Sequence, residues 1–353
     1  MCGVTESERR HLIGPLLKEV SRSFYLTLRV LPAALRPVIS LAYLLARASD
    51  TIADTKVVPR EKRREHLIRF RRQFEVGLDE AELGLIRSDL AQHQSLPAEK
   101  QLLDQLDSCF TMLRLLHEDD QRRIAKLLGV ITRGQENDLV QFPGETEAEL
   151  AAFETEQQLD DYTYAVAGCV GKFWTEMCVA HLRVLRGWNA TEMVANGIRF
   201  GKGLQLTNIL RDIPRDLRIG RCYIPRQKLV EAGLQPHDLL APEAIQRFRP
   251  LYDRYLDLTL EHLDVGWRYT LAIPRSQARL RLACTWPIFI GLRTVALLRR
   301  SADVLNPATR VMVAQRDVNW MLVKTILLCR SNARLDADYS SLRAAATTSQ
   351  TSL

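Results

Sequence analysis

Apolar residues recur at three- and four-residue spacing along most of the chain, the pattern of helices that bury one face. It is clearest in residues 16–31, 38–55, 120–140, 159–185 and 191–213. No series of alternating apolar and polar residues, divided by hairpin turns, indicates a sheet. We therefore predict an all-α protein, with about ten or more helices in a single large bundle.

The 353-residue chain, 46% hydrophobic, is long enough to bury a large core. It contains no Pro/Gly/Ser-rich linker, charge block or internal repeat that would mark a domain boundary. We therefore predict one helical domain over residues 1–335. Residues 336–353 are rich in small and polar side chains and are predicted to form a disordered tail.

The sequence favours a cytoplasmic protein. The N-terminal residues "MCGVTESERR" lack the apolar core of a signal peptide. The most apolar run, residues 282–298, contains Pro287 and Arg293, so we predict a core helix there and not a membrane span. The seven cysteines are scattered without a Cys-x-x-Cys pair, which fits buried thiols in a reducing compartment.

The net charge of +7 is spread along the chain, and Arg-rich stretches such as residues 60–73 alternate with apolar residues at helical spacing. Solvated helix faces explain most of this charge, and attraction to anionic lipid or substrate is the second explanation. No nucleic-acid recognition motif is present. We expect peripheral association with the anionic inner face of a membrane, and no obligate protein partner is evident.

Two Asp-x-x-x-Asp pairs stand on segments predicted to be helical: "DTIAD" at residues 50–54 and "DIPRD" at 212–216. Residues four apart share a helix face, so each pair places two like charges together at a cost in stability. Asn208 precedes Asp212 by the same spacing. Pro214 falls between the second pair and is predicted to loosen or end its helix.

Carboxylate and amide oxygens suit Mg²⁺, which is commonly held by a few carboxylates together with substrate phosphates. Two such pairs on facing helices would grip a diphosphate through bridging ions and assist its departure. A single pair is frequent on solvated helices and indicates little. Two pairs on apolar helices of an all-helical chain leave metal binding and ordinary surface charge as competing interpretations.

The chain resembles the squalene/phytoene synthase family, whose members have the all-α isoprenoid synthase fold around a central cavity. The matching segments are "SRSF" (21–24), "YLLARASDTIAD" (43–54), "YTYAVAGCVG" (162–171) and "LQLTNILRDIPRDLRIGRCYIP" (204–225). They occur in the family's order and span roughly residues 15–330.

The resemblance implies roles for individual residues. Asp50, Asp54, Asn208, Asp212 and Asp216 match the metal-binding residues, and Tyr164 matches a tyrosine proposed to handle a proton or stabilise a cation. The positions that match substrate-binding segments are Ser21, Arg22, Ser23, Phe24, Tyr43, Arg47, Gln205 and Arg211.

Ordinary structural explanations compete with these roles. Tyr164 could be a core tyrosine, and Gly168 and Gly171 could simply allow close helix packing. Arg47 and Arg211 could be surface arginines, although arginine beside carboxylate pairs suits phosphate binding. The hydroxyls of Ser21 and Ser23 could bond to the backbone of the preceding turn.

"DTIAD" is closest to the first motif of squalene synthases, because phytoene- and dehydrosqualene-forming members usually begin that motif with two adjacent acids. Ala53 and Thr55 replace acids of the eukaryotic pattern, which leaves the number of Mg²⁺ ions open. No C-terminal membrane anchor follows, as in bacterial members. The resemblance thus implies condensation of two farnesyl diphosphates to presqualene diphosphate, followed by reduction to squalene with NADPH.

No glycine-rich dinucleotide fingerprint is present, so NADPH would be held by scattered basic residues: Arg22, Arg47, Arg211, and Arg310 or Arg316. Three alternatives stay open. The protein could form dehydrosqualene or phytoene without reduction, act as a non-catalytic binding or assembly relative, or be a terpene cyclase on the same fold.

Overall fold

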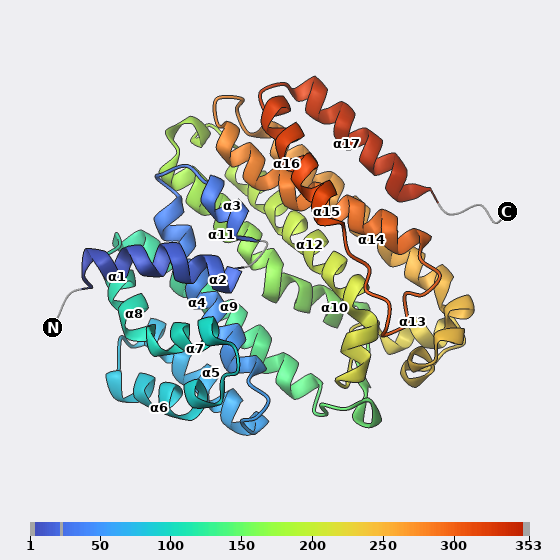
Figure 1. Cartoon of the computed structure of the whole chain (residues 1–353), viewed down its shortest axis with the longest axis horizontal. Coiled ribbons are helices and arrows are strands. Elements are labelled where there is room, and N and C mark those ends of the chain that lie inside the picture. Colours follow the sequence, from blue (N-terminus) through green and yellow to red (C-terminus); the bar gives the residue numbers. More distant parts are fainter. Residues whose placement is uncertain (1–3, 22–23, 349–353) are drawn as a thin grey trace. The chain divides into compact units, whose positions relative to one another are not determined.

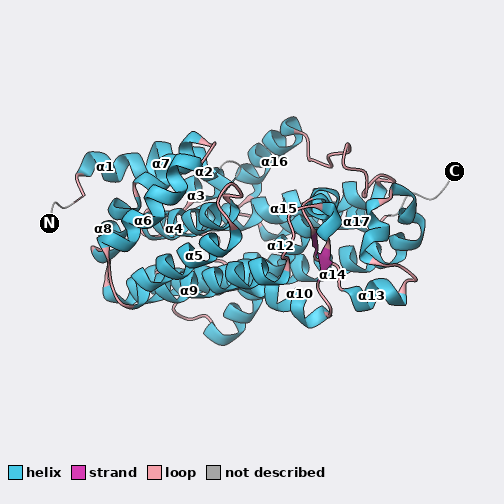
Figure 2. Cartoon of the chain, turned by 90° about the horizontal axis from the view of Figure 1, so that it is seen from below, coloured by secondary structure: helices cyan, strands magenta, loops and turns pink. Residues whose placement is uncertain are grey.

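The computed structural model describes residues 4–21 and 24–348 (Figure 1). Its contacts divide the chain into two compact units, each described here by itself. Unit 1 comprises residues 1–139 and 176–182, and unit 2 comprises residues 140–175 and 183–353. The prediction of an all-α protein is confirmed, since the described residues contain a single two-stranded pairing among many helices (Figure 2).

Unit 1 is built around α4 (Arg36–Asp54), which has Pro37 in its first turn and buries an apolar face that includes Leu44, Leu45 and Ile52. The helices that pack against it include η1, α2, α3, α5, α7 and α8. The bounds of the other helices between residues 4 and 141 are as follows: α1 (Glu6–His11), η1 (Leu12–Leu16), α2 (Leu17–Ser21), α3 (Tyr25–Val30), α5 (Arg60–Glu75), α6 (Glu80–Leu90), η3 (Ala91–His93), α7 (Pro97–Asp104), α8 (Leu106–Arg114) and α9 (Glu118–Gln141).

Unit 2 is built around α12 (Ala190–Arg218), which packs against α14 (Ile245–Ala272), α15 (Ala278–Arg300) and the π-helical turn η5 (Tyr164–Gly168). Strand β1 (Ala151–Ala152) pairs in parallel with strand β2 (Arg221–Cys222), which follows the end of α12. The other elements are η4 (Glu147–Glu149), α10 (Glu156–Thr163), α11 (Cys169–His181, which continues into unit 1), η6 (Arg183–Leu185), α13 (Arg226–Glu231), η7 (Pro236–Leu240), η8 (Pro242–Ala244), α16 (Gln315–Leu328) and α17 (Asn332–Thr347).

Glycines allow the backbone of α12 to contact the backbone of the segment η5–α11 directly. A Cβ added to Gly171 would lie 1.9 Å from the carbonyl oxygen of Gly197, and one added to Gly201 would lie 2.2 Å from that of Ala167. A methyl group cannot fit at either position without moving a helix. Close helix packing, the structural explanation considered for Gly171, is therefore observed.

The sequence predicted that Pro214 would loosen or end its helix, and the helix does not end there, since α12 continues to Arg218. Proline lacks the N–H that would bond to the carbonyl of the residue four positions earlier, here Leu210. The hydroxyl of Tyr252, a fully buried residue of α14, donates to that carbonyl at 3.1 Å. A side chain from a neighbouring helix thus replaces the missing backbone donor.

The prediction of a disordered tail is wrong over residues 336–347, which belong to α17. Tyr339 stacks on Trp267 of α14, with ring centroids 4.6 Å apart and planes 1° from parallel. The Trp267 indole N–H donates to Asp336 at 2.8 Å, and the Arg299 guanidinium donates to the carbonyl of Ala346 at 2.8 Å. A few anchoring contacts therefore order a segment whose composition is mostly small and polar.

The apolar run at residues 282–298 is a core helix, as predicted. It forms most of α15, the one helix of the described residues long and apolar enough to cross a membrane, and most of that stretch is buried within the structure. Helices α12, α14, α16 and α17 pack against it.

Candidate active site

The first acid pair lies at the C-terminal end of α4 in unit 1. Asp50 is half-exposed and Asp54, the last residue of the helix, is exposed. Leu45, Ala48 and Ile52 anchor the buried side of this turn. The buried Arg63 of α5 donates to the carbonyl of Ala53 at 2.8 Å, which fixes the helix end.

Two side chains contact the Asp50 carboxylate. Gln135 of α9 donates an amide N–H to Oδ1 at 2.7 Å, and the Arg47 guanidinium lies 3.7 Å from Oδ2. Arg47 also makes a close ion pair with Glu99 of α7, whose side chain is almost fully buried. The sequence placed Arg47 beside Asp50 correctly but did not identify Gln135 or Glu99 as neighbours.

The pKa of Asp50 is raised from 3.8 to about 7. The main cause is the surrounding protein, which removes water from the carboxyl group, and the second cause is the negative charge of Asp54. Arg47 and the Gln135 amide act in the opposite direction but do not compensate. A cation bound between the two carboxylates would remove the repulsion that raises this pKa.

Of the substrate-binding candidates in unit 1, Phe24 and Tyr43 lie together, with rings stacked at 5.4 Å and 19°. Ser21 is buried at the end of α2 and its hydroxyl donates to the carbonyl of Leu17, the backbone-bonded alternative considered for it. Arg22 and Ser23 lie outside the described residues. A substrate role for these residues stays a prediction.

The second acid pair lies near the C-terminal end of α12 in unit 2. Asn208 is exposed, whereas Gln205, Asp212 and Asp216 are half-buried. Arg211 donates from Nε and Nη2 to the two carboxylate oxygens of Asp212, at 2.8 and 2.5 Å. The pKa of Arg211 is raised, chiefly by these hydrogen bonds, so the group stays a cation beside the pair.

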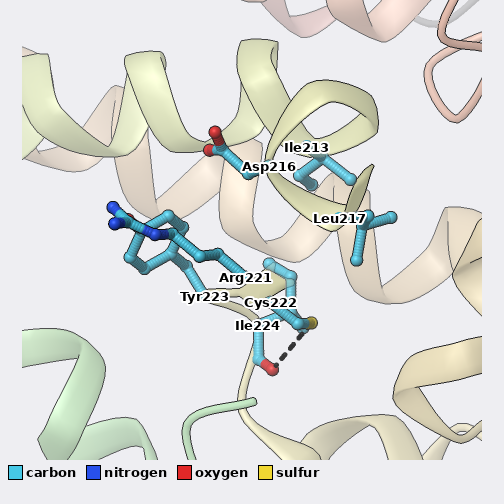
Figure 3. A pocket seen from close by; sticks show the side chains of 7 residues that line it. All are labelled: Ile213, Asp216, Leu217, Arg221, Cys222, Tyr223 and Ile224. Carbon is cyan, nitrogen blue, oxygen red and sulfur yellow. Dashed lines mark hydrogen bonds between the residues drawn. The ribbon is translucent and has the colours of Figure 1, made fainter. Parts of the chain in front are cut away.

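Asp216 also lines a small pocket with the residues of β2 and the turn after it (Figure 3). Asp216 enters from α12, whereas Arg221 and Tyr223 enter from the segment that follows the helix. Tyr223 stacks on Tyr162 of α10, with centroids 4.7 Å apart, and accepts a hydrogen bond from its hydroxyl at 3.3 Å. The sequence noted "GRCYIP" but assigned no role to Arg221 or Tyr223.

Gly220 makes the turn between α12 and β2. Its φ of +80° is a backbone conformation that favours glycine, and an added Cβ would lie 3.0 Å from the carbonyl of Thr146. This turn carries the chain directly from Asp216 to Arg221.

Tyr164, the candidate for proton handling, is half-buried at the start of the π-helical turn η5. Lys202 of α12 lies over its ring, with Nζ 6.0 Å from the centroid, and pairs with Asp160 at 2.5 Å. π-Helical turns recur at functional sites. Neither Lys202 nor Asp160 was a candidate from the sequence.

The remaining basic candidates, Arg310 and Arg316, are both exposed. Arg310 stands in the loop before α16, and Arg316, 89% exposed, stands in the first turn of that helix.

Among the residues that the structure describes, no group of three or more His, Cys, Asp or Glu side chains could hold a metal ion without other ligands. Each acid pair instead offers two carboxylates with an arginine beside them. This donor set fits Mg²⁺, which prefers hard oxygen ligands and completes its shell with water and substrate phosphate. The pKa of Asp50 is raised first by removal of water from its carboxyl group and second by the negative charge of Asp54.

Comparison with known proteins assigns the chain to a family. The model described as "Squalene/phytoene synthase" matches residues 17–317. The chain belongs to this family, whose members are prenyl transferases, and the resemblance noted from its motifs is confirmed.

Three relatives illustrate the range of the family. Presqualene diphosphate synthase of Sinorhizobium fredii is 33% identical over 228 residues, or 64% of this chain and 67% of the relative. Squalene synthase ERG9 of Saccharomyces cerevisiae is 25% identical over 84% of this chain and 63% of the relative. The chain matches 49% of a bifunctional lycopene cyclase/phytoene synthase of Phaeosphaeria nodorum, so it spans about half to two thirds of these proteins.

The fold has a close counterpart among solved structures. The complex of TcSQS with the ligand E5700 superposes with a TM-score of 0.77 at 20% identity, covering 98% of this chain and 94% of that one. The all-α isoprenoid synthase fold expected from the resemblance is therefore confirmed.

Proposed function

We propose that the protein condenses two farnesyl diphosphates head to head to presqualene diphosphate and then reduces this intermediate to squalene with NADPH. The observation that carries the proposal is the pair of acid clusters, each with an arginine against it, in a chain of this family. The printed activity of the Sinorhizobium fredii relative, presqualene diphosphate synthesis, supports the first step.

The chain's own residues account for binding the diphosphates. Asp50, Asp54, Asp212 and Asp216 would hold Mg²⁺, with Asn208 as a further oxygen ligand. Bound Mg²⁺ supplies positive charge to the departing diphosphate. Arg47 and Arg211 add fixed positive charge next to each pair, and a guanidinium can bind phosphate through two parallel hydrogen bonds.

The proposed reaction has two steps, a condensation and a reduction. In the first, one farnesyl diphosphate loses diphosphate, the resulting allylic cation bonds to the double bond of the second, and loss of a proton closes a cyclopropane. In the second, presqualene diphosphate loses its own diphosphate and the carbon skeleton rearranges; NADPH, held by basic residues of this chain, would supply the hydride that reduces the final cation. Tyr164 is the candidate for the proton, and apolar helix faces exclude the water that would capture a cation.

Arg310 or Arg316 would hold a phosphate group of NADPH, and both residues are exposed. Arg47 and Arg211 are engaged with carboxylates, so their first role in this proposal is at the diphosphates.

A second candidate ends at presqualene diphosphate, the product in the name of the Sinorhizobium fredii relative. Dehydrosqualene or phytoene synthesis without reduction stays the nearest other alternative. Incubation with farnesyl diphosphate and Mg²⁺, with and without NADPH, separates these products by mass spectrometry. We expect squalene only with NADPH.

Matched variants connect that assay to the site. Asp50→Asn and Asp212→Asn should each lower turnover at least about a hundredfold while the protein stays folded, because one ion ligand is lost. Asp104→Asn, at the exposed end of α7, is the control and should leave turnover unchanged. Full activity in either site variant would refute the assignment.

A further inference from the structure

Helix α16 carries an apolar face that the described residues of unit 2 do not cover. Trp320, Val323, Ile326 and Leu327 are 65%, 53%, 52% and 77% exposed. Most other exposed large apolar residues of the described chain are isolated along the sequence, whereas these four fall within eight residues. Single exposed apolar residues are ordinary, but a cluster of this kind marks an interaction site.

The face lies opposite the side by which α16 packs. Met321 and Thr325, one turn apart, are the buried residues of the helix, and the Trp286 indole of α15 donates to the Thr325 hydroxyl at 2.9 Å. Lys324 pairs with Asp338 of α17 at 2.5 Å. Helical spacing puts Trp320, Val323 and Leu327 on the side away from these contacts. Packing within unit 2 therefore holds the helix in place and leaves the apolar face outward.

Basic residues flank this face along the chain, Arg316 within α16 and Arg330 in the turn that follows the helix. Arg316 lies one turn before Trp320, and Arg330 follows Leu327 by three residues; both are exposed. Residues 304–335 contain five Lys or Arg but a single acidic residue, Asp317. The apolar residues are thus flanked by Arg316, whose Nε lies 3.8 Å from Asp317 Oδ1, and by Arg330, and Trp320 lies one turn from Arg316.

We propose that this face of α16 docks the protein on an anionic phospholipid bilayer. Amphipathic helices bind bilayer surfaces by burying apolar side chains below the headgroups while Lys and Arg contact anionic lipid. Tryptophan favours that interface. Charge complementarity selects the bilayer over a second copy of this chain, because two such faces would oppose their own arginines. The proposal does not depend on the reaction proposed above.

Vesicle co-sedimentation tests the proposal on the full chain. The protein should bind vesicles of phosphatidylglycerol and phosphatidylcholine, bind pure phosphatidylcholine far less, and release as salt rises. The variant Trp320→Gln/Val323→Gln/Leu327→Gln should bind at least about tenfold more weakly. The control Leu85→Gln/Leu115→Gln/Val230→Gln removes three exposed apolar residues elsewhere and should bind as the unaltered protein does. Equal binding of the two variants would overturn the proposal.

The cationic ends are tested separately, without altering Arg310 or Arg316. Arg330, in the turn after α16, and the exposed Arg334, in the first turn of α17, are changed together. Arg330→Gln/Arg334→Gln should weaken binding to anionic vesicles about thirtyfold, because each arginine near the surface contributes about 1 kcal/mol. Arg72→Gln/Arg114→Gln removes the same charge from unit 1 and should weaken binding much less. An equal loss in both variants would show that overall charge, and not this face, binds the lipid.

The fluorescence of Trp320 reports on lipid binding directly, and a single substitution is enough to test it. It is the one exposed tryptophan of the five in the chain, all of which lie in the described part. Anionic vesicles should shield it from acrylamide quenching, and Trp320→Phe should abolish the shielded component. Unchanged quenching with vesicles present would overturn the proposal, as would a lipid-free dimer that the triple α16 variant abolishes. Turnover of soluble farnesyl diphosphate should be equal in the α16 variants and the unaltered protein, so the reaction is tested independently.

Discussion

At the residue scale, the site depends on how each carboxylate is surrounded. Asp50 receives a hydrogen bond from Gln135 and lies near Arg47, but Arg47 is shared with the buried Glu99. Asp212 instead accepts two hydrogen bonds from the Arg211 guanidinium. Arginine therefore compensates the charge of Asp50 less directly than that of Asp212.

The raised pKa of Asp50 predicts how the metal-free protein responds to pH. A folded-state pKa of about 7, against 3.8 for the ordinary carboxyl, means that the folded state binds this proton more tightly than the unfolded state. The stabilisation is complete below pH 4 and is lost as pH rises through 7. In the presence of a chelator, Asp50→Asn should therefore melt at a higher temperature than the unaltered protein at pH 8, with a smaller difference at pH 5.

The control for this experiment is Asp104→Asn, which should show the same small difference at both pH values. A melting temperature of Asp50→Asn that follows the unaltered protein across the whole range would contradict the account of Asp50.

At the scale of elements, α12 accommodates two features that helices usually avoid. It contains a proline within its last turns and crosses η5–α11 at a distance that only glycine permits. Both features lie on the helix that carries the second acid pair, and each is compensated by a specific neighbour. The position of the acids in unit 2 thus depends on contacts made by residues without catalytic chemistry.

Tyr252→Phe tests the compensation at Pro214. Removing the hydroxyl leaves the Leu210 carbonyl buried without this donor and should lower the free energy of unfolding by about 1–3 kcal/mol. In a Pro214→Ala background the alanine N–H can bond to that carbonyl, so the same change should cost much less. Urea denaturation of the four proteins measures the difference. Equal costs in the two backgrounds would rule out the exchange of donors.

Gly197→Ala tests the close crossing. Its added Cβ would lie 2.5 Å from the Thr175 hydroxyl and 2.6 Å from the carbonyl of Gly171, so unfolding should become easier by about 1–3 kcal/mol. The control is Gly84→Ala in α6, where nothing lies within 4 Å of an added Cβ. That change should stabilise the protein by about 0.5–1 kcal/mol. Opposite signs in thermal melts are the expected result, and a neutral Gly197→Ala would contradict the packing described.

At the scale of the whole molecule, the helical pattern and the acid spacing were readable from the sequence because both depend on residues three or four apart. Asp50 and Asp54, or Asp212 and Asp216, share a face by helix geometry alone. The partners were not readable. Gln135 is 85 residues from Asp50, and Glu99 is 52 from Arg47, so only folding brings them together.

The errors have the same origin. Composition predicted a disordered tail because residues 336–353 contain few large apolar side chains. Tyr339 is one of those few, and its stack on Trp267 cannot be inferred from either segment alone. Likewise, Pro214 reads as a helix end until Tyr252, 42 residues from Leu210, supplies a donor.

The central claim is that the two acid pairs act on diphosphates in two successive ionisations. Its most direct test is the amount of inorganic diphosphate released per farnesyl diphosphate consumed, measured with Mg²⁺ present. Without NADPH, the account predicts one diphosphate for every two substrates while presqualene diphosphate accumulates. With NADPH, it predicts one for every substrate, together with squalene. Diphosphate release at one per substrate without any reductant, in step with a single C15 product, would contradict head-to-head condensation.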